Sequence, residues 1–301
     1  MNIGLVYSGG ISKCAYQLGF TQALAKHLDK CDVTVKAISG ASMGIFTGYA
    51  LSARKLDTLE DVYKNVGTTG ALSLFWQVCM KKLLYRGINT FFSLSDRLEI
   101  PVCFPMTSIP ILSTKYFWIN KSFNPFWKRY IYAATNFPFL CGMPKFIDRR
   151  LAIDGGAVDN IPLYPLIKKK EDFLKSNEEL DLIIVLHFNS RYNYRKEFRT
   201  TIPVLDLDIS INNDFKKQHF DFSKSYIDEM LSSSREYGDK ICNKMFYGAT
   251  DKNSLIDKIN DIFLAEHEIR QWHESIDGLV STVNSVGRLF RRESSCSTKL
   301  Y

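Results

Sequence analysis

The sequence predicts an α/β protein with a mainly parallel central sheet, and three observations support this prediction. Two short apolar runs near the N-terminus, Ile3–Tyr7 and Val33–Ile38, have the length and composition of buried strands. Each run ends in a glycine-containing turn, and each turn leads into a segment with helical character, at 15–27 and 45–52. Two consecutive strand–loop–helix units imply parallel strands joined by right-handed crossovers, with the chemistry-bearing loops at the carboxyl ends of the strands.

Later segments of the chain also carry signals of strands and helices. Residues 151–153 form a predicted short strand that stops at a glycine turn, and residues 182–186 form a fully buried strand. Residues 71–100 are rich in large apolar side chains, which either form a lid or cover the sheet. Residues 254–289 are predicted to be helical and lead into a polar tail at 291–301.

The size and composition of the chain indicate a single globular domain. With 301 residues and 46% hydrophobic content, the chain is expected to bury one large core, so we predict one domain at 1–290 followed by the tail at 291–301. The net charge of +7 would attract anionic membranes or nucleic acid equally. No nucleic-acid recognition motif is found, and we therefore expect no nucleic-acid partner.

The cysteines and the N-terminus indicate where the protein resides. Its seven cysteines are scattered without a C-x-x-C pair, which argues against a disulfide framework. The N-terminus lacks the basic start and apolar stretch of a signal peptide, and no window is apolar enough to span a bilayer. We predict a cytoplasmic protein whose membrane contact, if any, is peripheral.

A serine nucleophile is suggested by the second glycine turn. Gly40-Ala41-Ser42-Met43-Gly44 fits the pattern G-x-S-x-G, in which the glycines allow a strand to turn sharply into a helix while exposing the serine. The turn follows a predicted strand and opens a predicted helix, as this geometry requires. The amino end of that helix would favour negative charge developing beside Ser42.

The first glycine turn, Ser8-Gly9-Gly10, is suited to stabilise an oxyanion. Glycine lets a substrate approach the main chain closely, so the N–H groups of Gly9, Gly10 and Ile11 are the candidate donors, and Lys13 adds positive charge. A nucleotide-phosphate loop is the alternative, but the spacing matches neither G-x-G-x-x-G nor a Walker lysine.

A base is the third requirement, because a serine hydroxyl is a weak nucleophile until a group accepts its proton. Asp154 is the candidate. It ends a short apolar strand and precedes Gly155 and Gly156, which would hold its carboxylate on a tight loop at the edge of the sheet. Asp154 as a simple turn cap is the alternative.

These three segments, in this order, resemble the patatin-like phospholipase family, in particular bacterial-type patatin-like acyl hydrolases. Residues 8–19 look like the glycine-rich oxyanion segment with Lys13 at its basic position, Gly40–Gly44 like the nucleophile elbow, and 154–162 like the D-G-G segment. An Ala-Ala-Thr-Asn-Phe-Pro stretch at 133–138 precedes the last of these. The resemblance covers the motif-bearing residues 1–190 and implies a three-layer α/β/α fold with a serine–aspartate dyad.

The sequence departs from the family pattern at two positions. Ile11 stands where many members carry a third glycine, and Cys14 stands where they carry another small residue. The oxyanion loop is therefore expected to differ in shape, although its donors are main-chain groups. A Ser–Asp–His triad is the alternative to the dyad, and His187, at the end of the 182–186 strand, is the histidine in the expected place.

Together these features predict a serine acyl hydrolase of the phospholipase A or lysophospholipase type. Ser42 would attack a carboxylic ester of a phospholipid or lysophospholipid, and Asp154 would accept its proton to give an acyl-enzyme. No cofactor is expected, and no histidine–cysteine spacing suggests a metal site. An esterase or thioesterase acting on soluble acyl substrates and a catalytically weak lipid-binding protein are the alternatives.

Overall fold

The computed structural model describes residues 1–68, 76–93, 95–120, 126–137, 142–167, 180–189, 200–209, 221–248, 253–266 and 268. The chain divides into two compact units, Met1–Ile256 and Asp257–Tyr301. The described part of the second unit is helical, in agreement with the start of the helix predicted at 254–289. The tail predicted at 291–301 lies outside the described residues. All the candidate site residues belong to the first unit.

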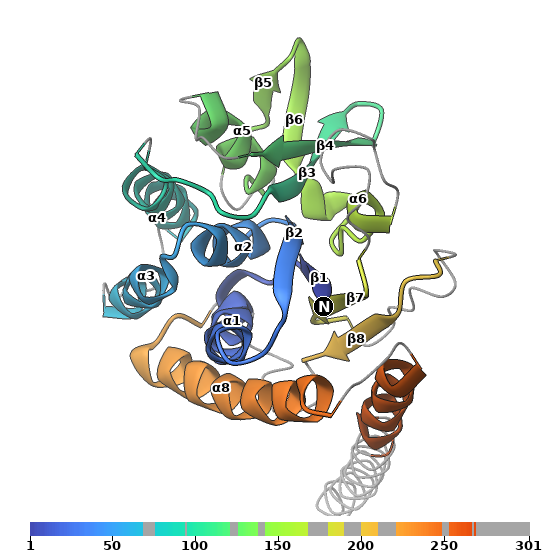
Figure 1. Cartoon of the computed structure of the whole chain (residues 1–301). Coiled ribbons are helices and arrows are strands. Elements are labelled where there is room, and N and C mark those ends of the chain that lie inside the picture. Colours follow the sequence, from blue (N-terminus) through green and yellow to red (C-terminus); the bar gives the residue numbers. More distant parts are fainter. Residues whose placement is uncertain are drawn as a thin grey trace, which may run out of the picture. The chain divides into compact units, whose positions relative to one another are not determined.

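An eight-stranded sheet forms the centre of the first unit (Figure 1). Its parallel part has the order β3-β2-β1-β7-β8. The bounds are β1 (Asn2–Tyr7), β2 (Thr34–Gly40), β3 (Val102–Ile109), β7 (Leu182–His187) and β8 (Val204–Asp208). Strands β1, β2 and β7 lie where the apolar runs predicted them, and they are buried almost throughout.

Beyond β2 the sheet continues as an antiparallel extension built on β3. One edge of β3 pairs with β4 (Ser113–Ile119), and the other pairs first with β2 and then with β6 (Arg150–Asp154), which in turn pairs with β5 (Lys145–Ile147). Strand β6 therefore runs back toward the carboxyl end of β2. This arrangement brings the last residue of β6, Asp154, to the turn that follows β2.

Helices cover both faces of the sheet, which confirms the α/β fold with a mainly parallel sheet (Figure 1). On one face, α1 (Cys14–Leu28), α2 (Gly44–Ser52) and α8 (Lys224–Phe246) contribute to a large buried apolar cluster. Helices α3 (Leu56–Thr68), α4 (Trp76–Phe91) and α5 (Phe126–Ala134) extend that layer. On the other face, α6 (Tyr164–Ile167) packs in a second cluster with β1, β2 and β7.

Large side chains from the C-terminal part of the apolar segment at 71–100 pack in the main buried cluster. Phe91 and Phe92 are fully buried, and both rings contact Phe46 and Tyr49 of α2. For these residues the interpretation as a cover for the core is therefore the better one. Residues 69–75 and the side chains of 76–80 lie outside the described part.

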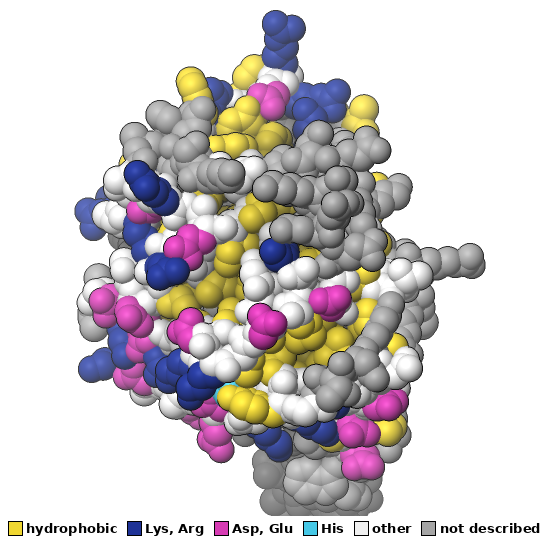
Figure 2. All heavy atoms as spheres, viewed as in Figure 1, with side chains coloured by type: hydrophobic (Ala, Val, Ile, Leu, Met, Phe, Trp, Pro, Cys, Tyr) yellow, Lys and Arg dark blue, Asp and Glu magenta, His cyan; other side chains and the backbone are white. Residues whose placement is uncertain are grey.

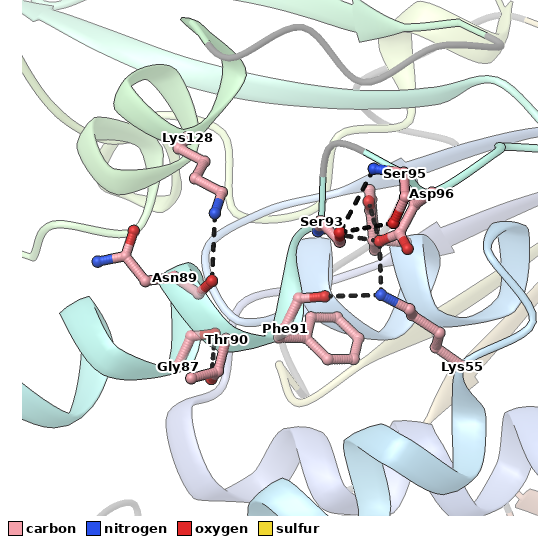
Figure 3. A network of polar contacts seen from close by, with 10 residues as sticks. Lys55, Gly87, Asn89, Thr90, Phe91, Ser93, Ser95, Asp96 and Lys128 are labelled. Atoms are coloured by element: carbon pink, nitrogen blue, oxygen red, sulfur yellow. Dashed lines mark hydrogen bonds and ion pairs between the residues drawn. The ribbon is translucent and has the colours of Figure 1, made fainter.

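A polar network holds the segment after α4 against α2 (Figure 3). The Asp96 carboxylate accepts hydrogen bonds from Lys55 Nζ at 2.6 Å, from the Tyr49 hydroxyl at 2.6 Å and from the Ser93 N–H at 3.0 Å. Lys55 also donates to the carbonyl of Phe91. Burial would raise the pKa of Asp96, but these hydrogen bonds outweigh burial and hold the pKa below its usual value.

Candidate active site

Ser42 lies on a sharp turn between β2 and α2. Strand β2 ends at Gly40 and helix α2 begins at Gly44, so only three residues separate them. The φ angle of Ser42 is +50°, which is a strained conformation for a residue other than glycine. A side chain at Gly44 would place its Cβ 2.7 Å from the carbonyl oxygens of Tyr7 and Ser8. The turn therefore requires a glycine at this position.

Asp154 meets Ser42 at the end of β6. The Ser42 hydroxyl donates to Asp154 Oδ2 at 2.6 Å, although 112 residues separate the two in the sequence. The other carboxylate oxygen, Oδ1, accepts the N–H of Gly156 at 2.8 Å. Gly155 and Gly156 thus form the tight turn predicted for them, and they orient the carboxylate toward the serine.

The main chain fixes Asp154 from its other side as well. Its N–H donates to the carbonyl of Asn136, which belongs to the Ala-Ala-Thr-Asn-Phe-Pro stretch singled out in the sequence. The Asn136 side chain in turn donates to the carbonyl of Met143. This stretch therefore positions the aspartate, and its last residue, Pro138, lies outside the described residues.

Burial changes the protonation of Asp154. The side chain is 1% exposed, and this burial raises its pKa to about 6, against the smaller lowering effect of the hydrogen bonds from Ser42 and Gly156. A carboxylate with this pKa is ionised at neutral pH yet is much more basic than an ordinary aspartate. It is thus suited to accept the proton of a hydroxyl 2.6 Å away.

The glycine turn after β1 lies directly beside Ser42. A Cβ at Gly9 would be 2.9 Å from Ser42 Cβ, so this position tolerates only glycine. The N–H of Gly9, predicted as an oxyanion donor, is already used: it donates to Asn160 Oδ1 at 3.1 Å and to the Asn160 carbonyl at 3.3 Å. The Gly10 N–H faces the Cys14 thiol, whereas the Ile11 N–H donates to no other residue in the described part of the chain. Gly10 and Ile11 remain the candidate donors to an oxyanion.

Ile11 adopts a backbone conformation that favours glycine, which stands at this position in many members of the family. Its φ angle is +53°, in the left-handed region, where a β-branched side chain costs roughly 1–2 kcal/mol and glycine costs nothing. The loop therefore keeps the backbone path of a glycine despite the isoleucine. Cys14, the other departure, is fully buried, with its Sγ 3.8 Å from the carbonyl of Ser8.

Lys13 is buried rather than directed to solvent. The residue is 4% exposed, and burial lowers the pKa of its ammonium group, while the negative charge of Asp208 at the end of β8 acts in the opposite direction. The sequence indicated Lys13 as a source of positive charge at the oxyanion loop. Its described electrostatic neighbour is Asp208.

Asn160 falls within the D-G-G segment, but the sequence assigned it no role. Its side-chain oxygen accepts the Gly9 N–H, and its side-chain NH₂ donates to the Gly9 carbonyl at 3.2 Å. Asn160 therefore holds the glycine turn through two side-chain hydrogen bonds. The neighbouring Asp159 accepts a hydrogen bond from the Tyr116 hydroxyl of β4 at 2.6 Å. Asn160 thus links the loop that follows β6 to the loop that follows β1.

We expect Asn160→Ala to lower kcat about 10- to 100-fold with little change in KM, because displacing the Gly10 and Ile11 N–H groups affects the oxyanion more than substrate binding. Steady-state kinetics on an activated ester would measure this split. The thermal unfolding midpoint, recorded in parallel, should change only slightly because Asn160 is exposed. A variant with unchanged kcat would show that the contact does not position the donors.

His187 lies at the end of β7, as expected, but its ring nitrogens face other groups. Nε2 is 2.9 Å from Asp206 Oδ1, and Nδ1 accepts the N–H of Asn189 at 3.1 Å. Both ring nitrogens are thus engaged with residues other than Ser42 and Asp154. The arrangement favours the dyad over the triad that included His187.

The described residues show neither a metal-binding cluster nor a helix suited to span a membrane. Within these ranges, no group of three or more histidine, cysteine, aspartate or glutamate side chains is placed to hold a metal ion. In the same part of the chain, no helix has both the length and the apolar character needed to cross a bilayer.

Comparisons with known proteins show which family the chain resembles in sequence. A family model described as patatin-like phospholipase matches residues 5–167. Lysophospholipase NTE1 from two strains of Cryptococcus neoformans var. neoformans serotype D is 28% identical over 204 residues, which cover 61% of this chain but only 11% of the fungal proteins.

Two solved structures give more distant likenesses. VipD from Legionella pneumophila has 13% identity and a TM-score of 0.38 over 77% of this chain and 67% of that chain. The type III effector protein ExoU has 13% identity and a TM-score of 0.25, covering 100% of this chain and 66% of that chain. The family model spans more than half of the sequence and contains Ser42, Asp154 and the glycine turn after β1, and the chain therefore belongs to the patatin-like phospholipase family.

Proposed function

We propose that the protein hydrolyses carboxylic ester bonds of phospholipids or lysophospholipids, with Ser42 as the nucleophile and Asp154 as its base. The observation that carries the proposal is the 2.6 Å hydrogen bond from the Ser42 hydroxyl to the buried carboxylate of Asp154. Ser42 itself lies on a strained turn between a strand and a helix. Family membership supports the reaction class.

Acylation begins when Asp154 takes the Ser42 proton and Ser42 Oγ attacks the ester carbonyl carbon. The negative charge that forms on the carbonyl oxygen would be stabilised by the N–H groups of Gly10 and Ile11 and by the amino end of α2. Collapse of this intermediate releases the alcohol, a lysophospholipid or a glycerophosphoester, with the proton returning from Asp154. The fatty acyl group remains on Ser42.

Deacylation repeats the same steps with water as the nucleophile. Asp154 accepts a proton from the water as its oxygen attacks the acyl carbon, and Ser42 recovers the proton when it leaves. One residue serves as base in both halves, so no histidine is required. Since the base must be ionised, kcat/KM should fall tenfold per pH unit below the pKa of about 6.

The test compares aggregated with monomeric acyl substrates. We expect the purified protein to release fatty acid, detected by mass spectrometry, from phosphatidylcholine vesicles and lysophosphatidylcholine micelles. Its rate with a short-chain lysolipid should rise steeply at the concentration where that lipid aggregates, because a lipid hydrolase works at an interface.

Other outcomes would favour the alternatives. A rate that depends only on total concentration, with equal turnover of water-soluble esters or thioesters, would indicate an esterase or thioesterase. Lipid binding without fatty-acid release, together with no reaction of Ser42 with a fluorophosphonate probe, would indicate a lipid-binding protein instead. The same assay identifies the bond that is cut, because each acyl position leaves a different lysolipid.

A further inference from the structure

The far end of the antiparallel extension carries exposed apolar side chains. Ile111 and Leu112, in the turn between β3 and β4, are 79% and 66% exposed. Phe146 of β5 and Leu151 of β6 are 59% and 43% exposed. We refer to these four residues, with Lys145, Arg149 and Arg150, as the hairpin surface. Soluble proteins rarely concentrate large apolar side chains on protruding turns without a partner.

The strand register places these apolar residues together. Phe146 pairs directly with Leu151 across β5 and β6, and Leu151 pairs with Ile109 across β6 and β3. Residues opposite one another in antiparallel strands project from the same face with their Cβ atoms about 5 Å apart. Ile111 and Leu112 follow Ile109 within three residues. Phe146, Leu151 and Ile109 therefore line one face of the extension, and Ile111 and Leu112 lie in the turn at its end.

The hairpin surface is strongly basic as well as apolar. The tip of the β5–β6 hairpin, residues 145–151, carries Lys145, Arg149 and Arg150 against one acidic residue, Asp148. Lys145 is half-buried, with its Nζ 4.7 Å from the centre of the Tyr132 ring. Asp148 accepts a hydrogen bond from the Tyr130 hydroxyl at 2.7 Å. Arg149 and Arg150 are both exposed. Figure 2 shows basic and hydrophobic side chains side by side at this end of the molecule, where Figure 1 places the tips of β5 and β6.

The hairpin surface lies beyond the end of the sheet that carries the candidate active site. Strand β3 pairs with β2 only through Val102 and Cys103 and then continues six residues past the carboxyl end of that pairing, in the direction in which the Ser42 turn leaves β2. Along β6, Asp154 is three positions after Leu151, which is about 10 Å at the rise of a strand. The tips thus project outward from the edge that holds the dyad.

We propose that the hairpin surface docks the protein on the surface of an anionic lipid bilayer, with the apolar tips inserted among the acyl chains and the basic residues at the headgroups. The proposal rests on the proposed function for its biological meaning, because docking here would bring lipid within reach of Ser42. A mixture of basic and apolar exposed residues is the pattern of an interfacial anchor.

A second copy of the chain is the competing occupant, since β5 is an edge strand of the sheet. Charge disfavours it. A symmetric contact would bring three basic residues and one acidic residue of each copy against the same set of the other, and like charges facing one another repel. An anionic bilayer offers the complementary charge.

The test measures vesicle binding by flotation with full-length Ser42→Ala protein, so that lipid is not consumed. Vesicles of phosphatidylcholine alone are compared with vesicles that also contain phosphatidylglycerol. We expect tighter binding to the mixed vesicles, weakened by high salt. The double variant Arg149→Gly with Arg150→Gln should weaken that binding roughly tenfold or more, at about 1 kcal/mol per basic residue. Glycine suits position 149, where φ is +64°.

The apolar part is tested by Ile111→Ser with Leu112→Ser, which alters an exposed turn and spares the core. This variant should bind both vesicle types at least about tenfold more weakly than its parent, because inserted apolar area is lost. The matched control is Lys26→Gln with Lys30→Gln, which removes two exposed charges at the end of α1, near the start of β2 and away from the hairpin surface. The control should bind like its parent.

Three outcomes would overturn the proposal. In the first, both hairpin variants bind vesicles as tightly as the parent. In the second, the α1 control loses as much binding as the hairpin variants. In the third, the protein forms a concentration-dependent dimer that the hairpin variants abolish, while their vesicle binding persists. Docking and catalysis can fail separately. Vesicle binding that depends on the hairpin without ester hydrolysis by the Ser42 protein would keep the docking proposal and remove the proposed function. Ester hydrolysis by the Ser42 protein, together with vesicle binding that the hairpin variants do not weaken, would keep the proposed function and remove the docking proposal.

Discussion

Ser42→Ala is expected to reduce fatty-acid release by roughly 10⁴-fold or more, because without the nucleophile no acyl-enzyme can form. The fold should be unaffected. Ser42 is only partly buried, and alanine removes one hydrogen bond, to Asp154 Oδ2. Alanine must still adopt the φ of +50°, so a small loss of stability is expected from the strained turn. Release of fatty acid and the thermal unfolding midpoint should be measured on the same preparation.

A control serine separates the nucleophile from any general effect of the substitution. Ser232, on an exposed position of α8, donates only to the carbonyl of Glu229 in its own helix. Ser232→Ala should keep full activity and full labelling by a fluorophosphonate probe, whereas Ser42→Ala should lose both. Fatty-acid release by Ser42→Ala at the parent rate would remove Ser42 from the mechanism.

The parts of the fold that were predictable are those with local signals. Strands β1, β2 and β7 are unbroken apolar runs bounded by turns, and α1 and α2 start soon after glycines. These signals lie within a few residues of one another, so the first two strand–loop–helix units could be read directly.

The antiparallel extension could not be predicted in the same way. Strand β3 is buried along nearly all of its length, so it lacks the alternation of apolar and polar residues that marks a strand with one exposed face. Strand β4 contains three consecutive aromatic residues, Tyr116, Phe117 and Trp118, so it lacks that alternation as well. Helix α8 was also missed, although Ile227, Leu231 and Met230 show the helical spacing that could have revealed it.

Within the site, the candidate side chains could be selected from the sequence, and their main-chain partners could not. Ser42 and Asp154 were identified because nucleophile turns and glycine-flanked aspartates have sequence signatures. That the Gly9 N–H is taken by Asn160 depends on a contact between residues 151 positions apart. No local pattern encodes such a contact, because it arises only when β6 has folded back toward β2.

Asp154→Asn is expected to lower the rate of fatty-acid release by about 10²- to 10⁴-fold while making the protein more stable at neutral pH. Asparagine cannot accept the Ser42 proton, which accounts for the loss of rate. It fits the same space: its Oδ1 can accept the Gly156 N–H, and its amide can donate to Ser42 Oγ. The stability gain follows from removing a buried charge that burial disfavours.

The sign of the stability effect follows from the pKa. Because the folded-state pKa of Asp154 is raised from 3.8 to about 6, the folded state holds a proton more tightly than the unfolded state. The unfolding free energy of the parent protein therefore falls by about 2–3 kcal/mol, through this group, as pH rises from 4 to 6. The asparagine that replaces Asp154 does not titrate, so the difference between the two proteins should grow across that window and stay constant above it.

Chemical denaturation of the two proteins at a series of pH values measures this difference directly, since contributions from all other groups cancel. A loss of activity with a parallel loss of stability would mean that Asp154 serves chiefly to hold the loop together. A loss of activity with a gain in stability that appears between pH 4 and 6 identifies a buried carboxylate kept ionised at a cost to the fold. That cost is understandable only if the charge is used, and its nearest described hydrogen-bond donor is the hydroxyl of Ser42.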